Sequence, residues 1–248
     1  MTNKVLTIIP VRLASTRLPN KPLANICGKT MIQRVYEQAL SANLGEILIA
    51  CDGEEIANEV KKFGGKFIIT DPNLPSGTDR IYAAYKKFHG ENFEVILNLQ
   101  GDLPNIDPQI IRAAAKTALE YDCDIATVAS KISNEAEITN PNIVKIALAF
   151  REENLGKALY FSRSAIPYAK NLNHDFYHHI GIYAYKKSAL EKFVNLAPSF
   201  LEKRESLEQL RALENDLKIL VKIVAAHPFS VDTQEDLANV TKLIASQQ

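Results

Sequence analysis

Short apolar runs alternate with amphipathic stretches along the first half of the chain. The apolar run Val5–Val11 is typical of a strand buried on both faces. In Met31–Ala42 the apolar residues recur on one helical stripe. The same alternation predicts strands at Glu46–Cys51, Lys66–Thr70, Val95–Gln100 and Asp124–Ser130, and helices after Asp52 as an N-cap, over Gly77–Phe88 and over Pro108–Leu119.

This order of elements predicts βαβ units in an α/β fold. Parallel strands joined by right-handed crossovers place helices on both faces of a mostly parallel sheet. Ligands bind such sheets at the carboxyl ends of the strands. The loops expected there are Arg12–Lys29, Asp71–Thr78 and Gly101–Asp107.

The pattern changes after about Ser130. Strands are predicted at Val144–Ala149, His179–Tyr185 and Lys222–Ala225, with Ala158–Ile166 of mixed character; helices are predicted over Ser199–Leu213, where Ser206 and Gln209 have capping-box spacing, and at the end of the chain. Neither a repeat nor a Pro/Gly-rich linker is visible in the sequence. We therefore expect one domain, with a core at about 1–130 and 220–248 and an inserted lobe at about 131–219.

Composition narrows the class of protein. The 248 residues carry 29 Lys+Arg and 29 Asp+Glu, and a formal net charge of zero argues against a nucleic-acid binder. Hydrophobic residues make up 46% of the chain, enough for a large core without metal or disulfide support. Cys27, Cys51 and Cys123 match no metal-binding spacing, and we interpret them as inert thiols. With no signal-peptide pattern and no run of about 20 apolar residues, we expect a soluble, cytoplasmic protein without membrane association.

The loop after the first strand is the first candidate for chemistry. Between Val11 and Thr30 it holds Arg12, Arg17, Lys21 and Lys29 and no acidic residue. Arg and Lys side chains in such a loop suit a polyphosphate. The loop contains no Walker A motif, and the chain has no GxGxxG fingerprint. A solvated basic loop is the alternative interpretation.

Two aspartates are candidate Mg²⁺ ligands. Asp102 follows the strand Val95–Gln100, and Asp232 precedes the last helix. Mg²⁺ commonly takes one or two carboxylates together with substrate phosphates. The alternatives are a turn role for Asp102 and a helix-capping role for Asp232, with Thr233 as a second candidate for that cap. The sequence has no GxSxG, HExxH or Cys/His cluster, so Ser-based hydrolysis and a zinc site are not expected.

Eight ordered blocks now identify a resemblance. They are IIPVRLASTRLPNKPL, SGTDR, LNLQGDLP, NPNIVKIAL, ALYFSRSAIPY, HHIGIYAY, LEQLR and VDTQEDL, and they extend from Ile8 to Leu237. In these blocks the chain resembles the 3-deoxy-manno-octulosonate cytidylyltransferases (CMP-Kdo synthetases). The resemblance implies a glycosyltransferase-A-like, Rossmann-like nucleotidyltransferase fold with an inserted lobe for sugar binding and dimerisation. It also implies a cytoplasmic, Mg²⁺-dependent homodimer that couples CTP to the sugar acid Kdo, releasing pyrophosphate, for lipopolysaccharide biosynthesis.

The resemblance also implies roles for individual residues. The phosphates of CTP would be held by Arg12, Ser15, Arg17 and Lys21; the nucleotide would be approached by Ser76, Gly77, Arg80 and Gln100; and Mg²⁺ would be bound by Asp102 and Asp232. Arg17, Lys21, Asp102 and Asp232 would be the catalytic set. The sugar pocket would comprise Arg163, His179, Tyr183, Glu208 and Gln209, with Arg163 and His179 donating hydrogen bonds to the sugar carboxylate.

The sequence departs from the family pattern at three positions. Leu103 stands where QGDEP has Glu, His178 stands where the family pair is Arg-His, and Asp79 replaces the Glu after SGT. Asp102 is intact, so we expect the metal site to remain. His178 replaces a basic side chain of the family, and we expect this change to affect the affinity for the sugar or a dimer contact. A cytidylyltransferase for amino-Kdo or a sialic acid, and a non-catalytic nucleotide-binding regulator, are the alternative functions.

Overall fold

The first apolar run forms strand β1 (Val5–Pro10), and all six of its residues are buried. A computed structural model describes residues 4–14, 17–88, 93–170, 175–225 and 228–247, and the chain divides into two units. The first unit comprises residues 1–112 and 228–248, and the second comprises residues 113–227. The expected lobe had narrower bounds, at about 131–219, but the same place within the chain.

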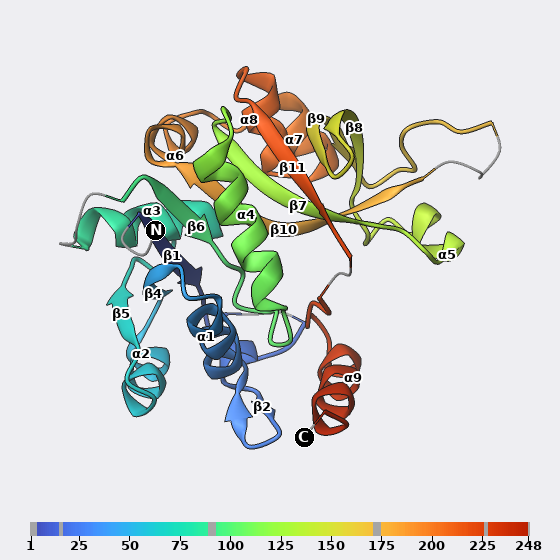
Figure 1. The fold of residues 1–248 in the computed structure, drawn as a ribbon. Coiled ribbons are helices and arrows are strands. Elements are labelled where there is room, and N and C mark those ends of the chain that lie inside the picture. Colours follow the sequence, from blue (N-terminus) through green and yellow to red (C-terminus); the bar gives the residue numbers. More distant parts are fainter. Residues whose placement is uncertain (1–3, 15–16, 89–92, 171–174, 226–227, 248) are drawn as a thin grey trace. The chain divides into compact units, whose positions relative to one another are not determined.

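Four parallel strands form the sheet of the first unit, in the order β5-β4-β1-β6. Helices α1 and α2 lie on one face of this sheet and α3 lies on the other (Figure 1). This is the arrangement expected of right-handed crossovers that first run outward from β1 and then return past it. The bounds are β4 (Gly45–Cys51), β5 (Lys66–Ile69), β6 (Val95–Asn98), α1 (Met31–Ala42), α2 (Glu54–Lys62) and α3 (Gly77–Lys87). The predicted helices and strands of this half are therefore confirmed.

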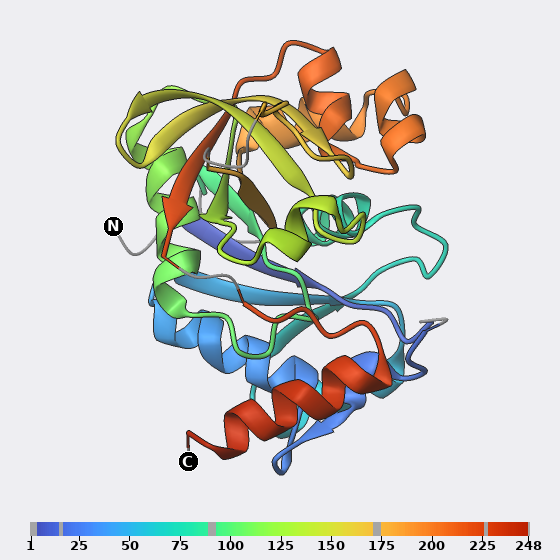
Figure 2. The same ribbon diagram turned by 90° about the vertical axis from the view of Figure 1, so that its right-hand side faces the viewer.

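The C-terminal helix α9 (Gln234–Ala245) completes the first unit. It lies beside the short hairpin β2 (Asn25–Ile26) and β3 (Lys29–Thr30), as Figures 1 and 2 both show. Between the helix and the segment after β1 lies a separate apolar cluster, which consists of Leu18, Ile26, Met31, Val231, Val240 and Ile244. This cluster fixes the end of the chain against the loop that follows β1. A short 3₁₀ helix, η1 (Lys21–Leu23), lies in that loop.

The second unit has a mixed sheet, in the order β10-β7-β11-β9-β8. Strands β7 and β11 pair in parallel, whereas β10–β7, β11–β9 and β8–β9 are antiparallel, so the expectation of a mostly parallel sheet does not extend to this unit. The strands are β7 (Ile125–Lys131), β8 (Lys145–Glu152), β9 (Leu155–Ser162), β10 (Tyr177–Lys186) and β11 (Ile219–Val224). The helices are α5 (Glu135–Thr139), α6 (Lys187–Val194), α7 (Phe200–Glu205) and α8 (Gln209–Glu214), and α4 (Pro108–Glu120) passes from the first unit into the second.

Two capping predictions were wrong. The helix expected over Ser199–Leu213 is interrupted at Ser206, which has φ 54° and ends α7. The capping box is made instead by Ser199 and Glu202, at the start of α7. Asp52 does not cap α2 either, because the N-cap is Gly53 and the Asp52 carboxylate accepts a hydrogen bond from another loop.

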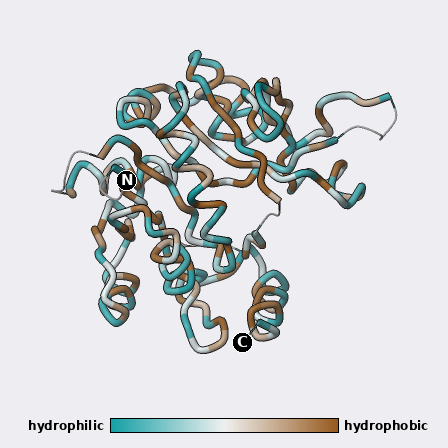
Figure 3. The backbone as a smooth tube through the Cα atoms, viewed as in Figure 1, coloured by the Kyte–Doolittle hydropathy of each residue, from teal (hydrophilic) through white to brown (hydrophobic). Residues whose placement is uncertain are grey.

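Apolar residues are concentrated in the strands of each unit, whereas the helices alternate between apolar and polar faces (Figure 3). Cys51 and Cys123 are buried, and burial raises the pKa of the Cys123 thiol to about 11, as expected for inert thiols. Cys27 is only partly buried. Among the described residues, none of the helices has both the length and the apolar content needed to cross a bilayer.

Candidate functional site

A pocket of about 340 Å³ opens at the carboxyl ends of the strands of the first unit. Its lining comes from the loops after β1, β5 and β6 and from the segment before α9. All but one of the predicted nucleotide, metal and catalytic residues line it: Arg12, Arg17, Lys21, Ser76, Gly77, Arg80, Gln100, Asp102 and Asp232. The exception is Ser15, which lies outside the described residues.

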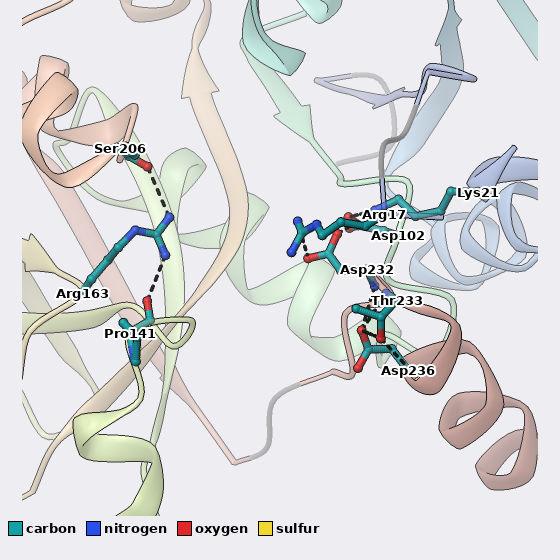
Figure 4. A network of polar contacts seen from close by, with 9 residues as sticks. All are labelled: Arg17, Lys21, Asp102, Pro141, Arg163, Ser206, Asp232, Thr233 and Asp236. Carbon is teal, nitrogen blue, oxygen red and sulfur yellow. Dashed lines mark hydrogen bonds and ion pairs between the residues drawn. The ribbon is translucent and has the colours of Figure 1, made fainter. Parts of the chain in front are cut away.

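Lys21 lies between the two aspartates. Its Nζ is 2.8 Å from Asp102 Oδ2 and 3.0 Å from Asp232 Oδ1, and its side chain is only 17% exposed (Figure 4). Arg17 Nη2 lies 3.2 Å from the other oxygen of Asp232. Burial acts to lower the pKa of Lys21, but the two carboxylates outweigh it, so the pKa is raised. The ammonium is therefore charged at neutral pH.

Asp102 and Asp232, which are 130 positions apart, are brought together by the backbone. The amide of Val231 donates to the carbonyl oxygen of Asp102 at 3.0 Å. This hydrogen bond joins the two backbone segments that carry Asp102 and Asp232. Thr233 is the N-cap of α9 and forms a capping box with Asp236. Since Thr233 satisfies the helix end, the Asp232 carboxylate is available to the pocket.

Helix α3 contributes a buried guanidinium, which the loop after β5 holds in place. Arg80 is 3% exposed, and its Nη1 donates to Thr70 Oγ1 at 2.5 Å and to the carbonyl of Asp71 at 3.3 Å. Burial lowers the pKa of Arg80, Asp52 opposes this effect, and Arg12 adds to it. These couplings place Arg80 within electrostatic range of Arg12, so two cations serve this part of the pocket.

Ser76 and Gly77 occupy the start of α3. Ser76 is the N-cap: its Oγ accepts from the amide of Asp79 at 3.1 Å and donates to the Asp79 carboxylate at 2.7 Å. Asp79 therefore supports the cap from within the first turn. Gln100 is held from the sheet, because its Nε2 donates to Asn98 Oδ1 at 3.2 Å.

Two features of this site were missed by the sequence analysis. Both carboxylate oxygens of Asp52 lie close to the amide of Leu13, at 3.2 and 3.1 Å, and thereby attach the basic loop to the end of β4. A Cβ atom on Gly101 would lie 2.4 Å from Val11 Cγ1, so only glycine allows the loop after β6 to approach β1 this closely. The position of Asp52 after a parallel strand was a signal, but its partner is visible only in the folded chain.

The predicted sugar-binding residues all lie in the second unit. His179 and Tyr183 are on β10, with ring centroids 5.4 Å apart, and Glu208 and Gln209 are at the start of α8. Burial, Tyr185 and Glu208 together raise the pKa of Tyr183 well above its ordinary value, so its phenol is neutral. The structure therefore brings Tyr183 into range of both His179 and Glu208.

His179 differs electrostatically from the expected carboxylate donor. It is 6% exposed, and burial followed by the charge of His178 lowers its pKa to about 3. The hydroxyl of Thr127 lies 3.0 Å from His179 Nε2 and 2.7 Å from the carbonyl oxygen of Ile182, to which it donates. Its lone pair thus accepts from Nε2–H, which leaves the imidazole neutral with Nδ1 as an acceptor. Such a ring suits a sugar hydroxyl better than a carboxylate.

Arg163 follows β9 and makes hydrogen bonds with a different group of residues. Its guanidinium donates to three backbone carbonyls. Nε donates to Glu205 at 3.0 Å, and Nη1 and Nη2 donate to Pro141 at 2.9 Å and to Ser206 at 3.4 Å, the two contacts drawn in Figure 4. These acceptors are uncharged. The guanidinium charge is therefore not neutralised by them and remains able to attract an anion.

Comparison with known proteins agrees with this geometry. The family model described as cytidylyltransferase matches residues 6–219. A protein of Brucella anthropi named 3-deoxy-manno-octulosonate cytidylyltransferase is 51% identical over 247 residues, covering 98% of each chain. A Parvibaculum lavamentivorans protein of the same name is 47% identical over 241 residues, covering 97% of this chain and 92% of its own.

Solved structures place the fold in the same group. The structure of a CMP:2-keto-3-deoxy-manno-octonic acid synthetase complexed with CTP has a TM-score of 0.91 and 38% identity, covering 99% of this chain and 100% of its own. A nucleotidyl transferase from Methanothermobacter thermautotroptrophicus, at 14% identity and a TM-score of 0.64, covers 99% of this chain and all of its own, and shares the fold. The chain thus has the nucleotidyltransferase fold expected from its sequence and belongs to the 3-deoxy-manno-octulosonate cytidylyltransferase family.

Proposed function

We propose that this protein activates the sugar acid Kdo with CTP, forming CMP-Kdo and pyrophosphate. The observation that carries the proposal is the pocket in which Arg17 and Lys21 meet Asp102 and Asp232 at the carboxyl ends of the strands. Family membership supplies the two substrates, because the named relatives are cytidylyltransferases for this sugar acid.

The reaction is an in-line displacement at phosphorus. The anomeric hydroxyl oxygen of Kdo forms a bond to the α-phosphorus of CTP, the bond from that phosphorus to the bridging oxygen breaks, and the hydroxyl proton is released. Positioning and charge neutralisation supply most of the rate in such reactions. Lys21 and Arg17 bind the phosphates and stabilise the charge that develops on the leaving pyrophosphate.

The donor set fits Mg²⁺. Asp102 and Asp232 offer hard carboxylate oxygens, and their side chains remain 25% and 37% exposed to the pocket. Among the described residues, no group of three or more His, Cys, Asp or Glu side chains gathers as a larger metal cage. A carboxylate pair suits an ion that also takes phosphate ligands. When bound, Mg²⁺ supplies charge neutralisation and polarisation at the phosphates.

In the second unit, Arg163 attracts the carboxylate of Kdo and the polar side chains near β10 and α8 bind its hydroxyls. We assign the carboxylate to Arg163 because its guanidinium is charged, whereas the imidazole of His179 is neutral. The hydroxyl groups of Kdo are then bound by the remaining residues of the set, which are His179, Tyr183, Glu208 and Gln209.

The experiment is a pyrophosphate-release assay on the purified protein with CTP, Mg²⁺ and a panel of sugar acids. We expect turnover with Kdo, and a higher kcat/KM for Kdo than for amino-Kdo or a sialic acid. A higher kcat/KM for another sugar acid would support the proposed cytidylyl transfer but would show that Kdo is not the preferred substrate. The absence of pyrophosphate release with every sugar acid would leave a nucleotide-binding regulator as the better interpretation.

The family resemblance also supports a proposal about the biological setting. We propose a cytoplasmic homodimer that uses the second unit for subunit contact and whose product enters lipopolysaccharide assembly. Light scattering coupled to size-exclusion chromatography tests the dimer directly, through a mass of twice 27.6 kDa.

A further inference from the structure

Lys145, on β8, is a fully buried lysine, with 0% exposure. Its Nζ donates to three backbone carbonyls, those of Asn140 at 2.7 Å, Ile143 at 2.6 Å and Arg163 at 2.5 Å. An ammonium has three protons, and here each has a carbonyl acceptor. The charged head of Lys145 is thus directed at the backbone of two separate segments.

Both segments concern Arg163. Asn140 and Ile143 flank the turn that contains Pro141, and the carbonyl of Pro141 accepts from Arg163 Nη1 at 2.9 Å. The third acceptor is the carbonyl of Arg163 itself. Lys145 therefore fixes the main chain of Arg163 and also the turn that receives one end of its guanidinium.

Glu205, at the end of α7, holds the same residue through its backbone amide. Its Oε2 accepts from the amide of Arg163 at 3.0 Å, and its Oε1 accepts from Ser162 Oγ at 2.7 Å. The carbonyl of Glu205 accepts from Arg163 Nε at 3.0 Å. The peptide groups on either side of the Arg163 Cα are thus bound by two side chains of opposite charge.

Burying an ammonium costs desolvation free energy, which an apolar side chain of similar length at the same position would avoid. Burial lowers the pKa of Lys145, and the nearby charge of Arg163 lowers it further, while Glu205 opposes both. One of the three hydrogen bonds of Lys145 goes to Arg163 itself, and the other two hold the turn whose Pro141 carbonyl accepts from Arg163. These hydrogen bonds restrict the orientation of the Arg163 side chain more than apolar packing alone would.

We propose that Lys145 and Glu205 are positioning residues, an Arg163 clamp, which orients the guanidinium for the carboxylate of the sugar acid. The inference rests on the role proposed for Arg163 and adds the two residues through which that role depends on the fold. Neither member of the clamp needs to touch the substrate.

The test separates sugar binding from stability and from nucleotide binding. KM for Kdo, KM for CTP and the urea midpoint are measured for Lys145→Met, Glu205→Ala, Arg163→Met and the Lys145→Met/Arg163→Met double variant. We expect KM for Kdo to rise about tenfold in each clamp variant and about fiftyfold in Arg163→Met, in line with the loss of charge-assisted hydrogen bonds. KM for CTP should stay within about twofold of the wild type, because the CTP pocket lies in the other unit. Lys218→Met is the control, since it removes a lysine charge of the second unit that pairs with Asp122 at 2.6 Å.

The double variant decides whether the clamp acts through Arg163. If it does, the double variant should have the same KM for Kdo as Arg163→Met alone. If the two substitutions instead act independently, their fold-increases in KM multiply, and that result overturns the proposal. Wild-type KM for Kdo in folded Lys145→Met also overturns it. Where Lys145→Met does not fold, Glu205→Ala decides in the same way, because the half-buried Glu205 is easier to replace. If Arg163→Met itself keeps its KM for Kdo, the role proposed for Arg163 falls and the clamp falls with it.

Discussion

Lys21 occupies the position in which a cation would neutralise both aspartates, and this predicts competition with the metal. Its ammonium is 2.8 Å from one carboxylate and 3.0 Å from the other. If Asp102 and Asp232 hold Mg²⁺ as proposed, the Lys21 ammonium would have to be displaced before both carboxylates could serve as ligands. The phosphates of bound CTP would assist this displacement, since they would offer Lys21 another partner. Lys21→Met, which keeps most of the stem and removes the charge, should therefore increase metal affinity in the absence of nucleotide.

The size of the effect follows from Coulomb's law. At the dielectric constant of water, charges at these two distances attract by about 1.5 and about 1.4 kcal/mol. The Asp232 side chain is 37% exposed, so salt screens its share further, and roughly half of the total remains. About 1.5 kcal/mol corresponds to a factor of roughly ten in a dissociation constant.

The assay is Mn²⁺ binding followed by electron paramagnetic resonance, with Mn²⁺ standing for Mg²⁺ and with no nucleotide present. Lys21→Met should bind Mn²⁺ about tenfold more tightly than the wild type, and pyrophosphate release should nevertheless collapse. Lys29→Met is the matched control, because Lys29 lies in β3, at the end of the same basic segment, and pairs with Glu37 at 2.8 Å instead. Equal Mn²⁺ affinity in Lys21→Met and the wild type would refute the competition. Loss of the extra affinity on adding Asp102→Asn would locate the ion at the expected carboxylate.

Three further outcomes are expected. Gly101→Ala should lower the free energy of unfolding by about 1–3 kcal/mol in a urea titration, since its Cβ would overlap Val11; wild-type stability would show that the loop can shift freely. Asp52→Ala should raise KM for CTP about tenfold by freeing the amide of Leu13, while Asp52→Asn, which keeps an acceptor oxygen, should lose much less; equal KM values in the two variants would contradict the anchoring role. His179 has a folded pKa of about 3 against an ordinary 6.5, so the unfolded state binds the extra proton between these values and stability falls as the pH drops from 6.5 toward 3. Urea midpoints at pH 7, 6 and 5 should therefore decline less steeply in His179→Gln than in the wild type, and parallel declines would count against a buried neutral imidazole.

The first unit could be predicted from the sequence because each element carries a local signal. The buried parallel strands are apolar runs such as Val5–Pro10, and α1 (Met31–Ala42) has the bounds that its apolar stripe predicted. The second unit was harder to predict, since antiparallel strands such as β9 combine buried, half-buried and exposed residues and leave a mixed pattern. The break at Ser206 depends on a left-handed backbone conformation that a serine gives no reason to expect.

The candidate site also has one part that the sequence predicted and another that only the folded chain reveals. Motifs placed Lys21 and Asp102 in a common region, but the contact between Asp102 and Val231 that brings in Asp232 joins segments far apart in the chain. Whether Asp232 or Thr233 capped α9 was left open by the spacing, and the hydrogen bonds of Thr233 decided it. Asp52 was assigned to the wrong partner because its true partner, the amide of Leu13, belongs to another loop.

The balance of charges along the chain recurs in one part of the pocket. Arg17 and Lys21 are paired with Asp102 and Asp232 before any substrate binds, so these two cations are compensated in the free site. Under the proposed function, a polyphosphate would bind by exchanging partners, and Asp102 and Asp232 would then be free to hold the accompanying Mg²⁺. Such an exchange would cost less than exposing four bare charges in a half-buried pocket, because these four side chains would keep counter-ions throughout. It would also couple nucleotide and metal binding, since each ligand would gain affinity from the partner that the other removes.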